Sequence, residues 1–221
     1  MAVNHPVPAR GVVKALHTHE ARLVALRARR EREYDALLDA ALRVLVRRGY
    51  ERTRVEDIMR EARISTRAFY RFCTGKGDLY LALFDRANRA AMTRLQGSLA
   101  RQARPRARLE AYIDATLDLA YRERLRPEVR LFLTAPAELG ARYAKEVMAC
   151  RAGLLAVLTE ILTAGRASGD FPTAEPEDDA WVISGALGTM LERVVLSDDP
   201  PPRARVARRL RRFCQAALAG E

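Results

Sequence analysis

The chain has 221 residues, of which 49% are hydrophobic, and it carries a formal net charge of +11. These apolar residues suffice for a packed core, and no apolar run approaches the roughly 18 residues that span a membrane. The start of the chain lacks the apolar stretch and cleavage site of a signal peptide. The three cysteines are widely separated, which favours a reducing compartment over a disulfide framework. We therefore expect a cytoplasmic protein with no membrane partner.

The positive charge is concentrated near the N-terminus. Residues 1–76 contain 17 Lys and Arg against 9 Asp and Glu, so most of the surplus lies in the first third of the chain. Clustered positive charge is expected of a domain that neutralises phosphates. An arginine-rich composition explains the choice of Arg over Lys, but it does not explain this asymmetry.

Residues 1–30 form a basic N-terminal extension. After Pro6 and Pro8, the segment Val12–Arg30 has a helical pattern. It is either an arm that contacts DNA phosphates or a minor groove, or a solvated extension of the next helix. Two histidines, His17 and His19, are two residues apart, a spacing that does not bring side chains together on a helix. We expect no metal site here and no cofactor elsewhere.

Three helices are predicted next. Glu31–Arg48 has a strong apolar face, and Gly49 suits the left-handed position that ends a helix. Thr53 and Glu56 have the spacing of a capping box that begins a second helix. Ser65 is a favourable N-cap for a third helix. Two short helices joined by a turn, the second carrying hydrogen-bond donors and arginines, are typical of a helix-turn-helix that enters the major groove of DNA.

Residues 53–79, TRVEDIMREARISTRAFYRFCTGKGDL, resemble the DNA-binding half of the tetracycline-repressor (TetR) family of bacterial transcription regulators. The matching residues are Thr53, Ile58, Ala62, Ser65, Tyr70, Lys76 and Leu79, with Ile64 and Phe69 as conservative variants. Two positions differ. Arg63 replaces the usual turn glycine, so it must adopt a left-handed conformation or bend the turn. Cys73 replaces the usual phenylalanine, and Phe72 beside it is a candidate for the same pocket.

The resemblance implies roles for individual residues, because phosphate contacts position such a motif and base contacts select the sequence. We assign three residues to phosphates: Thr53, Tyr70 and Lys76. The candidates for the groove are Thr66, Arg67 and Arg71. Arg67 is expected to make a bidentate contact with a guanine. Ser65 completes the predicted DNA-binding set, although its N-cap role alone would explain it.

The segment 74–77 breaks the helical pattern, and Asp78 begins a long helix predicted to run to about Arg104. It follows the recognition helix at once, so we expect it to transmit changes between two domains. We place a helix-turn-helix domain at residues 31–91, with its motif at 54–73, and a C-terminal domain at residues 92–221.

The remainder has helical periodicity without strand alternation, so the predicted fold class is all-α. The predicted helices are Arg106–Arg124, Glu128–Thr134, Ala137–Ala167, Glu177–Leu196 and Pro202–Ala219. Their order resembles the family's ligand-binding and dimerisation domain. The resemblance implies a homodimer through the last two helices, bound to a palindromic operator in double-stranded DNA. The last helix also carries a basic face that we interpret as solvated: Arg205, Arg208, Arg209 and Arg212.

The resemblance also implies a small hydrophobic or amphipathic ligand between the C-terminal helices. The candidate pocket residues are Tyr112, Thr116, Tyr143, Met148 and Trp181. For each of them, an ordinary core or surface position is the simpler interpretation. In the implied mechanism, ligand favours a dimer whose recognition helices no longer match the spacing of the half-sites.

The prediction is a dimeric, sequence-specific transcriptional regulator, a repressor released from its operator by a ligand. An enzyme is disfavoured because no G-x-S-x-G, P-loop or H-E-x-x-H motif is present and no histidine follows residue 19. Four alternatives stay open: an activator, a regulator without a ligand, a thiol sensor using Cys73 or Cys150, and a non-specific nucleoid protein.

Overall fold

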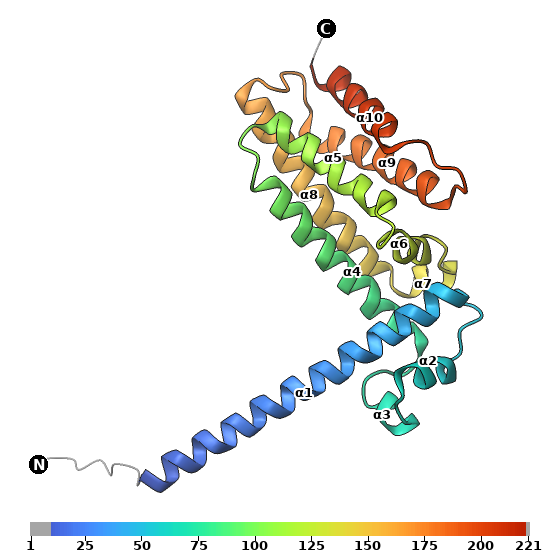
Figure 1. The fold of residues 1–221 in the computed structure, drawn as a ribbon. Helices are drawn as coiled ribbons and strands as arrows, with labels where there is room; N and C mark the ends of the chain where they lie inside the picture. Colours follow the sequence, from blue (N-terminus) through green and yellow to red (C-terminus); the bar gives the residue numbers. More distant parts are fainter. Residues whose placement is uncertain (1–9, 220–221) are drawn as a thin grey trace, which may run out of the picture.

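The computed structural model describes residues 10–219, with only the backbone of residues 10–21 and 23, and this range is helical without strands (Figure 1). The predicted all-α fold class is therefore confirmed for the described residues. The first four helices are α1 (Arg10–Arg48), α2 (Val55–Ala62), α3 (Thr66–Tyr70) and α4 (Lys76–Leu99). The others are α5 (Pro105–Tyr121), α6 (Arg126–Leu133), α7 (Ala137–Arg142), α8 (Ala144–Ser168), α9 (Pro176–Leu196) and α10 (Arg203–Leu218).

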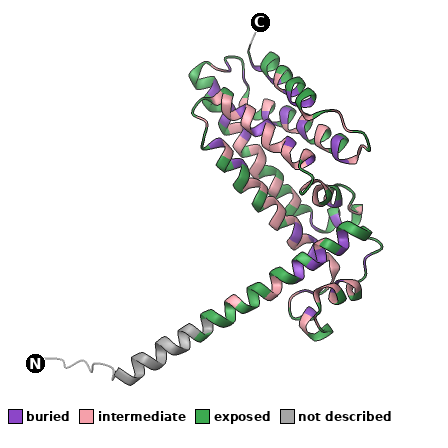
Figure 2. Ribbon diagram, viewed as in Figure 1, coloured by how far each residue is buried: buried purple, intermediate pink, exposed green. Residues whose placement is uncertain are grey.

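Helix α1 joins the two segments that were predicted separately, Val12–Arg30 and Glu31–Arg48, into one continuous helix. Its C-terminal part packs into the protein from Leu37 onward, whereas its N-terminal part projects from the body (Figures 1 and 2). His5 and the side chains of the other two histidines lie outside the described residues, so the prediction of no metal site there stays a prediction.

The start of α2 differs from the prediction by one residue. Its N-cap is Arg54, and the Asp57 carboxylate accepts the Arg54 backbone N–H at 3.2 Å. The predicted capping box of Thr53 and Glu56 is therefore wrong. The Thr53 hydroxyl instead donates to the Gly49 carbonyl oxygen at 2.7 Å, inside the loop that precedes the helix.

Of the two alternatives expected for Arg63, the turn between α2 and α3 takes the left-handed form, at φ 53° and ψ 44°. Its N–H donates to the Arg60 carbonyl oxygen, and the Ile64 N–H donates to that of Met59. These two bonds form a Schellman motif, which satisfies carbonyl groups at the end of α2. The left-handed geometry that glycine usually supplies is therefore retained with an arginine.

Two predicted helix ends were wrong. Helix α4 stops at Leu99 rather than near Arg104, and Pro105 occupies the first turn of α5, where a proline is well tolerated. The predicted helix 137–167 is broken at Tyr143, which has φ −113° and ψ 28°. The break separates α7, which packs against the helix-turn-helix, from α8, which packs in the C-terminal domain.

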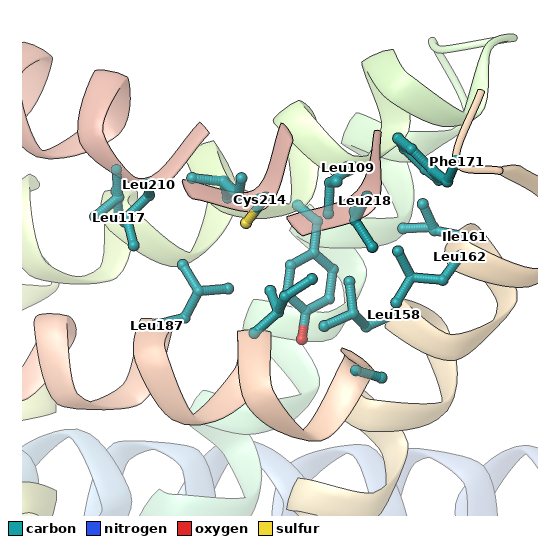
Figure 3. Packing of buried hydrophobic residues seen from close by; sticks show 14 of the residues in the cluster. Leu109, Leu117, Leu158, Ile161, Leu162, Phe171, Leu187, Leu210, Cys214 and Leu218 are labelled. Carbon is teal, nitrogen blue, oxygen red and sulfur yellow. The ribbon is translucent and has the colours of Figure 1, made fainter. Parts of the chain in front are cut away.

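Two apolar clusters account for most of the core. The N-terminal core joins α1–α4 to α6 and α7; its buried residues are Leu37, Leu38, Ala41, Val44, Leu45, Ile58, Phe69, Cys73, Leu79, Tyr80, Leu83, Leu131, Leu139 and Tyr143. The C-terminal core is built by the end of α4 with α5, α8, α9 and α10, and Figure 3 shows Leu117, Leu158, Leu187 and Leu210 converging within it. The N-terminal core therefore draws residues from far beyond the predicted domain boundary at 91/92.

Helix α8 is long and apolar enough to pass a length-and-composition test for a membrane span. Three of its residues, Leu158, Ile161 and Leu162, are fully buried in the C-terminal core. One helix that passes this test is weak evidence for a membrane span, and the three buried residues place this part of α8 in the C-terminal core.

Helix α10 is held on α5 by ion pairs as well as by apolar contacts. Arg203 donates to Asp114 at 3.1 Å and to Asp118 at 2.9 Å, and Arg211 also pairs with Asp114. The four arginines of the predicted basic face are exposed, as expected. Phe213, on the same helix, is 46% exposed.

Substitution of glycine by alanine is expected to have opposite effects on stability at two positions of α8. A Cβ at Gly165 would overlap the Phe171 ring, whereas a Cβ at Gly153 would lie 3.7 Å from Met92, an ordinary contact. We expect Gly165→Ala to lower the free energy of unfolding by about 1–3 kcal/mol through overpacking. Gly153→Ala should raise it by up to about 1 kcal/mol because alanine favours the helix. Urea denaturation followed by circular dichroism measures both, and changes of the same sign would contradict the packing described.

Candidate DNA-binding interface

The outer face of α3 presents three of the predicted DNA-binding residues together. Thr66, Arg67 and Tyr70 are exposed, while Phe69 between them is completely buried in the N-terminal core. Ser65 begins the helix, because its hydroxyl oxygen accepts the Ala68 N–H at 3.2 Å. The N-cap role predicted for Ser65 is therefore confirmed. Buried Phe69 fixes the rotation of α3, so the polar face points away from the protein.

Arg67 is the cation best placed on this face. No carboxylate among the described residues pairs with it. Two of the three acids of α2 are instead paired with α1: Glu61 with Arg43 and Arg47, and Asp57 with Arg48. Hydrogen bonds from Arg43 and Arg47 hold the pKa of Glu61 below its usual value. The guanidinium of Arg67 is left available to an external hydrogen-bond acceptor.

The structure separates Arg71 from this face. Its guanidinium donates to Glu33 of α1 at 2.9 Å and lies 5.0 Å from the centroid of the Phe72 ring. Arg71 follows the last residue of α3, so its side chain turns back toward α1. The predicted place of Arg71 beside Thr66 and Arg67 is corrected accordingly.

Thr53 does not lie on the surface predicted for it. Only 1% of the residue is exposed, and its hydroxyl is used within the loop that joins α1 to α2. A phosphate cannot reach this hydroxyl in the structure described. We therefore correct the assignment of Thr53 from a phosphate contact to a residue that shapes the loop.

Lys76 also has an internal role that the sequence did not reveal. Its ammonium donates to the carbonyl oxygens of Tyr50 at 2.9 Å and Thr53 at 3.1 Å, and it lies 4.3 Å from the centroid of the Tyr50 ring. These contacts tie the start of α4 to the loop before α2. An ammonium has three N–H donors, so one remains for a phosphate.

Cys73 occupies the apolar position that its place in the family pattern implies. It is 7% exposed, and burial raises the pKa of its thiol to about 11. Phe72 does not fill the same pocket, because its ring packs against Tyr34 of α1 with centroids 5.6 Å apart. Cysteine is smaller than phenylalanine, and the surrounding side chains of the N-terminal core close around it.

The predicted pocket residues do not converge on one cavity. Tyr112 is buried and its hydroxyl donates to the Leu154 carbonyl oxygen at 3.2 Å, with Thr116 one turn further along the same helix. Tyr143 belongs to the N-terminal core, while Met148 and Trp181 are 55% and 64% exposed. The prediction that these residues line one pocket is therefore corrected. Amphipathic side chains suit cores and interfaces equally, so the sequence did not distinguish the C-terminal core, the N-terminal core and the surface.

A different cavity of about 380 Å³ lies between α4, α5 and α8. It is lined by Gln96, Leu99, Ala100, Gln102, Arg108, Val157 and Glu160. The Nε atom of Arg108 is buried there and has no hydrogen-bond partner within residues 10–219 as described. None of these residues stood out in the sequence, because a single arginine among many carries no signal of a cavity.

Two family models match this chain. One, "Bacterial regulatory proteins, tetR family", matches residues 37–83, and the other, "Tetracyclin repressor-like, C-terminal domain", matches residues 105–217. The second alone spans half of the sequence. The chain belongs to the TetR family of bacterial regulatory proteins, whose members are DNA-binding transcriptional regulators rather than enzymes.

Solved structures share the fold at low identity. FadR from Bacillus subtilis, in complex with stearoyl-CoA, is 21% identical with a TM-score of 0.70, over 84% of this chain and 99% of its own. A TetR regulator from Haloarcula marismortui is 18% identical with a TM-score of 0.73, over 85% and 98%. AibR, in complex with isovaleryl coenzyme A and operator DNA, is 19% identical with a TM-score of 0.62, over 86% and 100%. No curated protein matches the chain.

The raised thiol pKa values predict how the cysteines react. At pH 8 only about a thousandth of the Cys73 thiol, with its pKa of about 11, is ionised. Cys73 and Cys214 are buried, whereas Cys150 is partly exposed. We expect iodoacetamide at pH 8 to modify Cys150 first and the other two only after unfolding in urea, as mass spectrometry would show. A Cys150→Ala variant should be nearly inert when folded, and rapid labelling of its Cys73 would contradict this.

Proposed function

We propose that this protein is a homodimeric, sequence-specific repressor that binds a palindromic operator and is released by a small-molecule ligand. The outer face of α3 carries the proposal. Thr66, Arg67 and Tyr70 are exposed together, and buried Phe69 holds their orientation. A short helix with a guanidinium and hydroxyl groups on its outer face suits the edges of bases in a major groove.

The exposed apolar side chains of the last two helices support dimerisation. Trp181 and Val182 of α9 are 64% and 59% exposed, and Phe213 of α10 is 46% exposed. Gly185, one turn after Trp181, is also exposed and permits a close approach. Exposed aromatic and aliphatic side chains on adjoining helices mark a protein interface. A second copy of the chain, related by a two-fold axis, would bury them and place two α3 helices on two half-sites.

The cavity between α4, α5 and α8 is the proposed ligand site. FadR binds stearoyl-CoA and AibR binds isovaleryl coenzyme A, which supports a small-molecule ligand in this fold. The cavity offers apolar surface from Leu99 and Val157 beside polar groups from Gln102 and Arg108. This lining suits an amphipathic molecule whose acidic group faces Arg108.

A regulator without a ligand is the second candidate, and it is favoured by the scattering of the predicted pocket residues. Thermal denaturation in the presence of fatty acids and their coenzyme A thioesters separates the two candidates. A rise in Tm that Arg108→Ala abolishes supports the ligand site, and no rise with any of them supports the second candidate.

The ligand site and α3 are linked through α7. Helix α8 begins directly after Tyr143, whose hydroxyl is buried beside Asp78 of α4. A Cβ at Gly77, in the first turn of α4, would lie only 2.9 Å from that hydroxyl. The neighbouring Lys76 is bonded to the loop before α2. A shift of α8 would therefore move Tyr143 against the base of α4 and so alter the placement of α3, which is how a ligand would change the population of the DNA-binding state.

The first test is selection of bound duplexes from a random pool. We expect a palindrome to be enriched. We expect Arg67→Ala to lose about 1–3 kcal/mol of binding free energy and to relax preference at one base position in each half-site. Arg212→Ala removes the same charge from α10 and should leave the preference unchanged. Equal loss on all sequences would make Arg67 a phosphate contact, and no enriched palindrome would reject the proposed dimeric repressor.

The link through α7 is tested by a pair of substitutions. Gly77→Ala should push against the Tyr143 hydroxyl and change operator affinity, whereas Tyr143→Phe removes that oxygen. In the double variant the affinity should return toward that of the unchanged protein, because the crowded atom is gone. A double-mutant cycle on operator affinity measures this coupling, and strictly additive effects would contradict it.

A further inference from the structure

The N-terminal part of α1 lies before the residues that the family models match. The family model for the DNA-binding domain begins at residue 37, although α1 begins at Arg10. The solved relatives are matched over 97–100% of their own length but cover only 84–86% of this chain. We call residues 10–36 the α1 arm. The match to the family model does not include it, so that match assigns it no role.

The direction of the α1 arm is set by the rest of the helix. Residues 37–45 of α1 are packed in the N-terminal core, and the helix continues without a break into the arm. Figure 1 shows the arm leaving the body beside α3, on the side away from α9 and α10. At about 1.5 Å per residue, it is roughly 40 Å long. The arm is therefore aimed past the helix-turn-helix and away from the proposed dimer interface.

The arm meets α3 in a cavity rich in guanidinium groups. This cavity, of about 300 Å³, is lined by Arg27, Arg30, Glu31, Tyr34, Arg71 and Phe72. The guanidiniums of Arg30 and Arg71 lie 5.9 and 5.0 Å from the centroid of the Phe72 ring, so both cations share one aromatic side chain. Three arginines therefore face one small space.

The acids nearby do not balance this charge. Glu33 is already shared by Arg29 and Arg71, through contacts of 3.0 and 2.9 Å. Glu31 lines the same cavity but forms no ion pair with Arg27 or Arg30 among the described residues. Arginines placed together without matching carboxylates repel one another, and a phosphate removes that repulsion with charge-assisted hydrogen bonds.

We propose that the α1 arm binds the DNA backbone that flanks the half-site contacted by α3, with Arg27 and Arg30 holding a phosphate beside Arg71. The proposal rests on the proposed function, because α3 must first place the duplex. An arm of this length extends over roughly one further turn of B-DNA, about 34 Å. Its contacts contribute affinity and salt dependence rather than base selection.

Binding to operator duplexes of two lengths tests this proposal. One duplex contains only the palindrome enriched by selection, and the other adds 15 base pairs of arbitrary sequence on each side, a length about one and a half helical turns. The dissociation constant is measured at several KCl concentrations for the full chain, for Arg27→Ala/Arg30→Ala, and for Arg104→Ala/Arg106→Ala. The last variant removes two exposed arginines near the start of α5, far along the chain from the arm. Alanine preserves the helix in the arm, which circular dichroism checks.

On the long duplex, Arg27→Ala/Arg30→Ala should reduce the slope of log Kd against log salt by about 1 for each protomer, since the single phosphate contact proposed for the two arginines contributes about 0.9. On the short duplex its slope should match that of the unchanged protein, and the control should match on both. An unchanged slope on the long duplex would overturn the proposal, as would equal losses on both duplexes, which would place the contacts within the half-site.

Val24 and Leu26 of the arm are also exposed, at 64% and 62%. These two side chains could instead join two copies of the chain. In that case Val24→Ser/Leu26→Ser would lower the mass measured by light scattering, and Arg27→Ala/Arg30→Ala would leave the slope of log Kd against log salt unchanged. This pair of results would also overturn the proposal. The proposed function and the arm proposal fail in different ways. If the unchanged protein enriches no palindrome, the proposed function is rejected. If it enriches a palindrome but the arginine substitutions leave the slope unchanged on the long duplex, only the arm proposal is rejected.

Discussion

The packing of α6 and α7 against the core of α1–α4 is the constraint on which the remaining features depend. Helix α3 has only five residues, too few to be stable as an isolated helix, so tertiary contacts must hold it. Its anchor, Phe69, lies in the same cluster as Leu131 and Tyr143, which come from the C-terminal half of the chain. The face of α3 that is proposed to contact DNA is therefore supported by residues from the C-terminal half of the chain.

Features governed by short-range geometry could be predicted from the sequence. Ser65 caps α3 because its hydroxyl reaches an N–H three residues later. Gly49 and Arg63 both end helices in the left-handed conformation. Arginine itself rarely adopts this conformation, so for Arg63 the expectation came from the glycine that the family pattern has at this position. The helical periodicity of the C-terminal half likewise fixed its fold class, since that signal depends on residues only three or four positions apart.

Roles that depend on distant partners could not be predicted. Arg71 looked like a groove residue until its partner was known to be Glu33, and Lys76 looked free although it is bonded to the loop at Tyr50 and Thr53. Arginine, lysine and threonine are compatible with both a solvated face and an internal hydrogen bond. Only the folded chain decides between them, because the partners are separated by 23 to 38 residues in sequence.

The arginines of α1 change role along the helix. Near its C-terminus, Arg43, Arg47 and Arg48 are paired with acids of α2, and exposed pairs of this kind stabilise a protein only slightly. Their main effect is to neutralise the carboxylates beside the DNA-binding face. Toward the N-terminus, Arg27 and Arg30 have no such partners among the side chains that the structure describes. They are nevertheless held on a helix that is anchored in the N-terminal core, so little backbone entropy is lost when a phosphate binds. A preorganised cationic helix can therefore contribute affinity that a flexible basic tail of the same composition would partly lose on ordering.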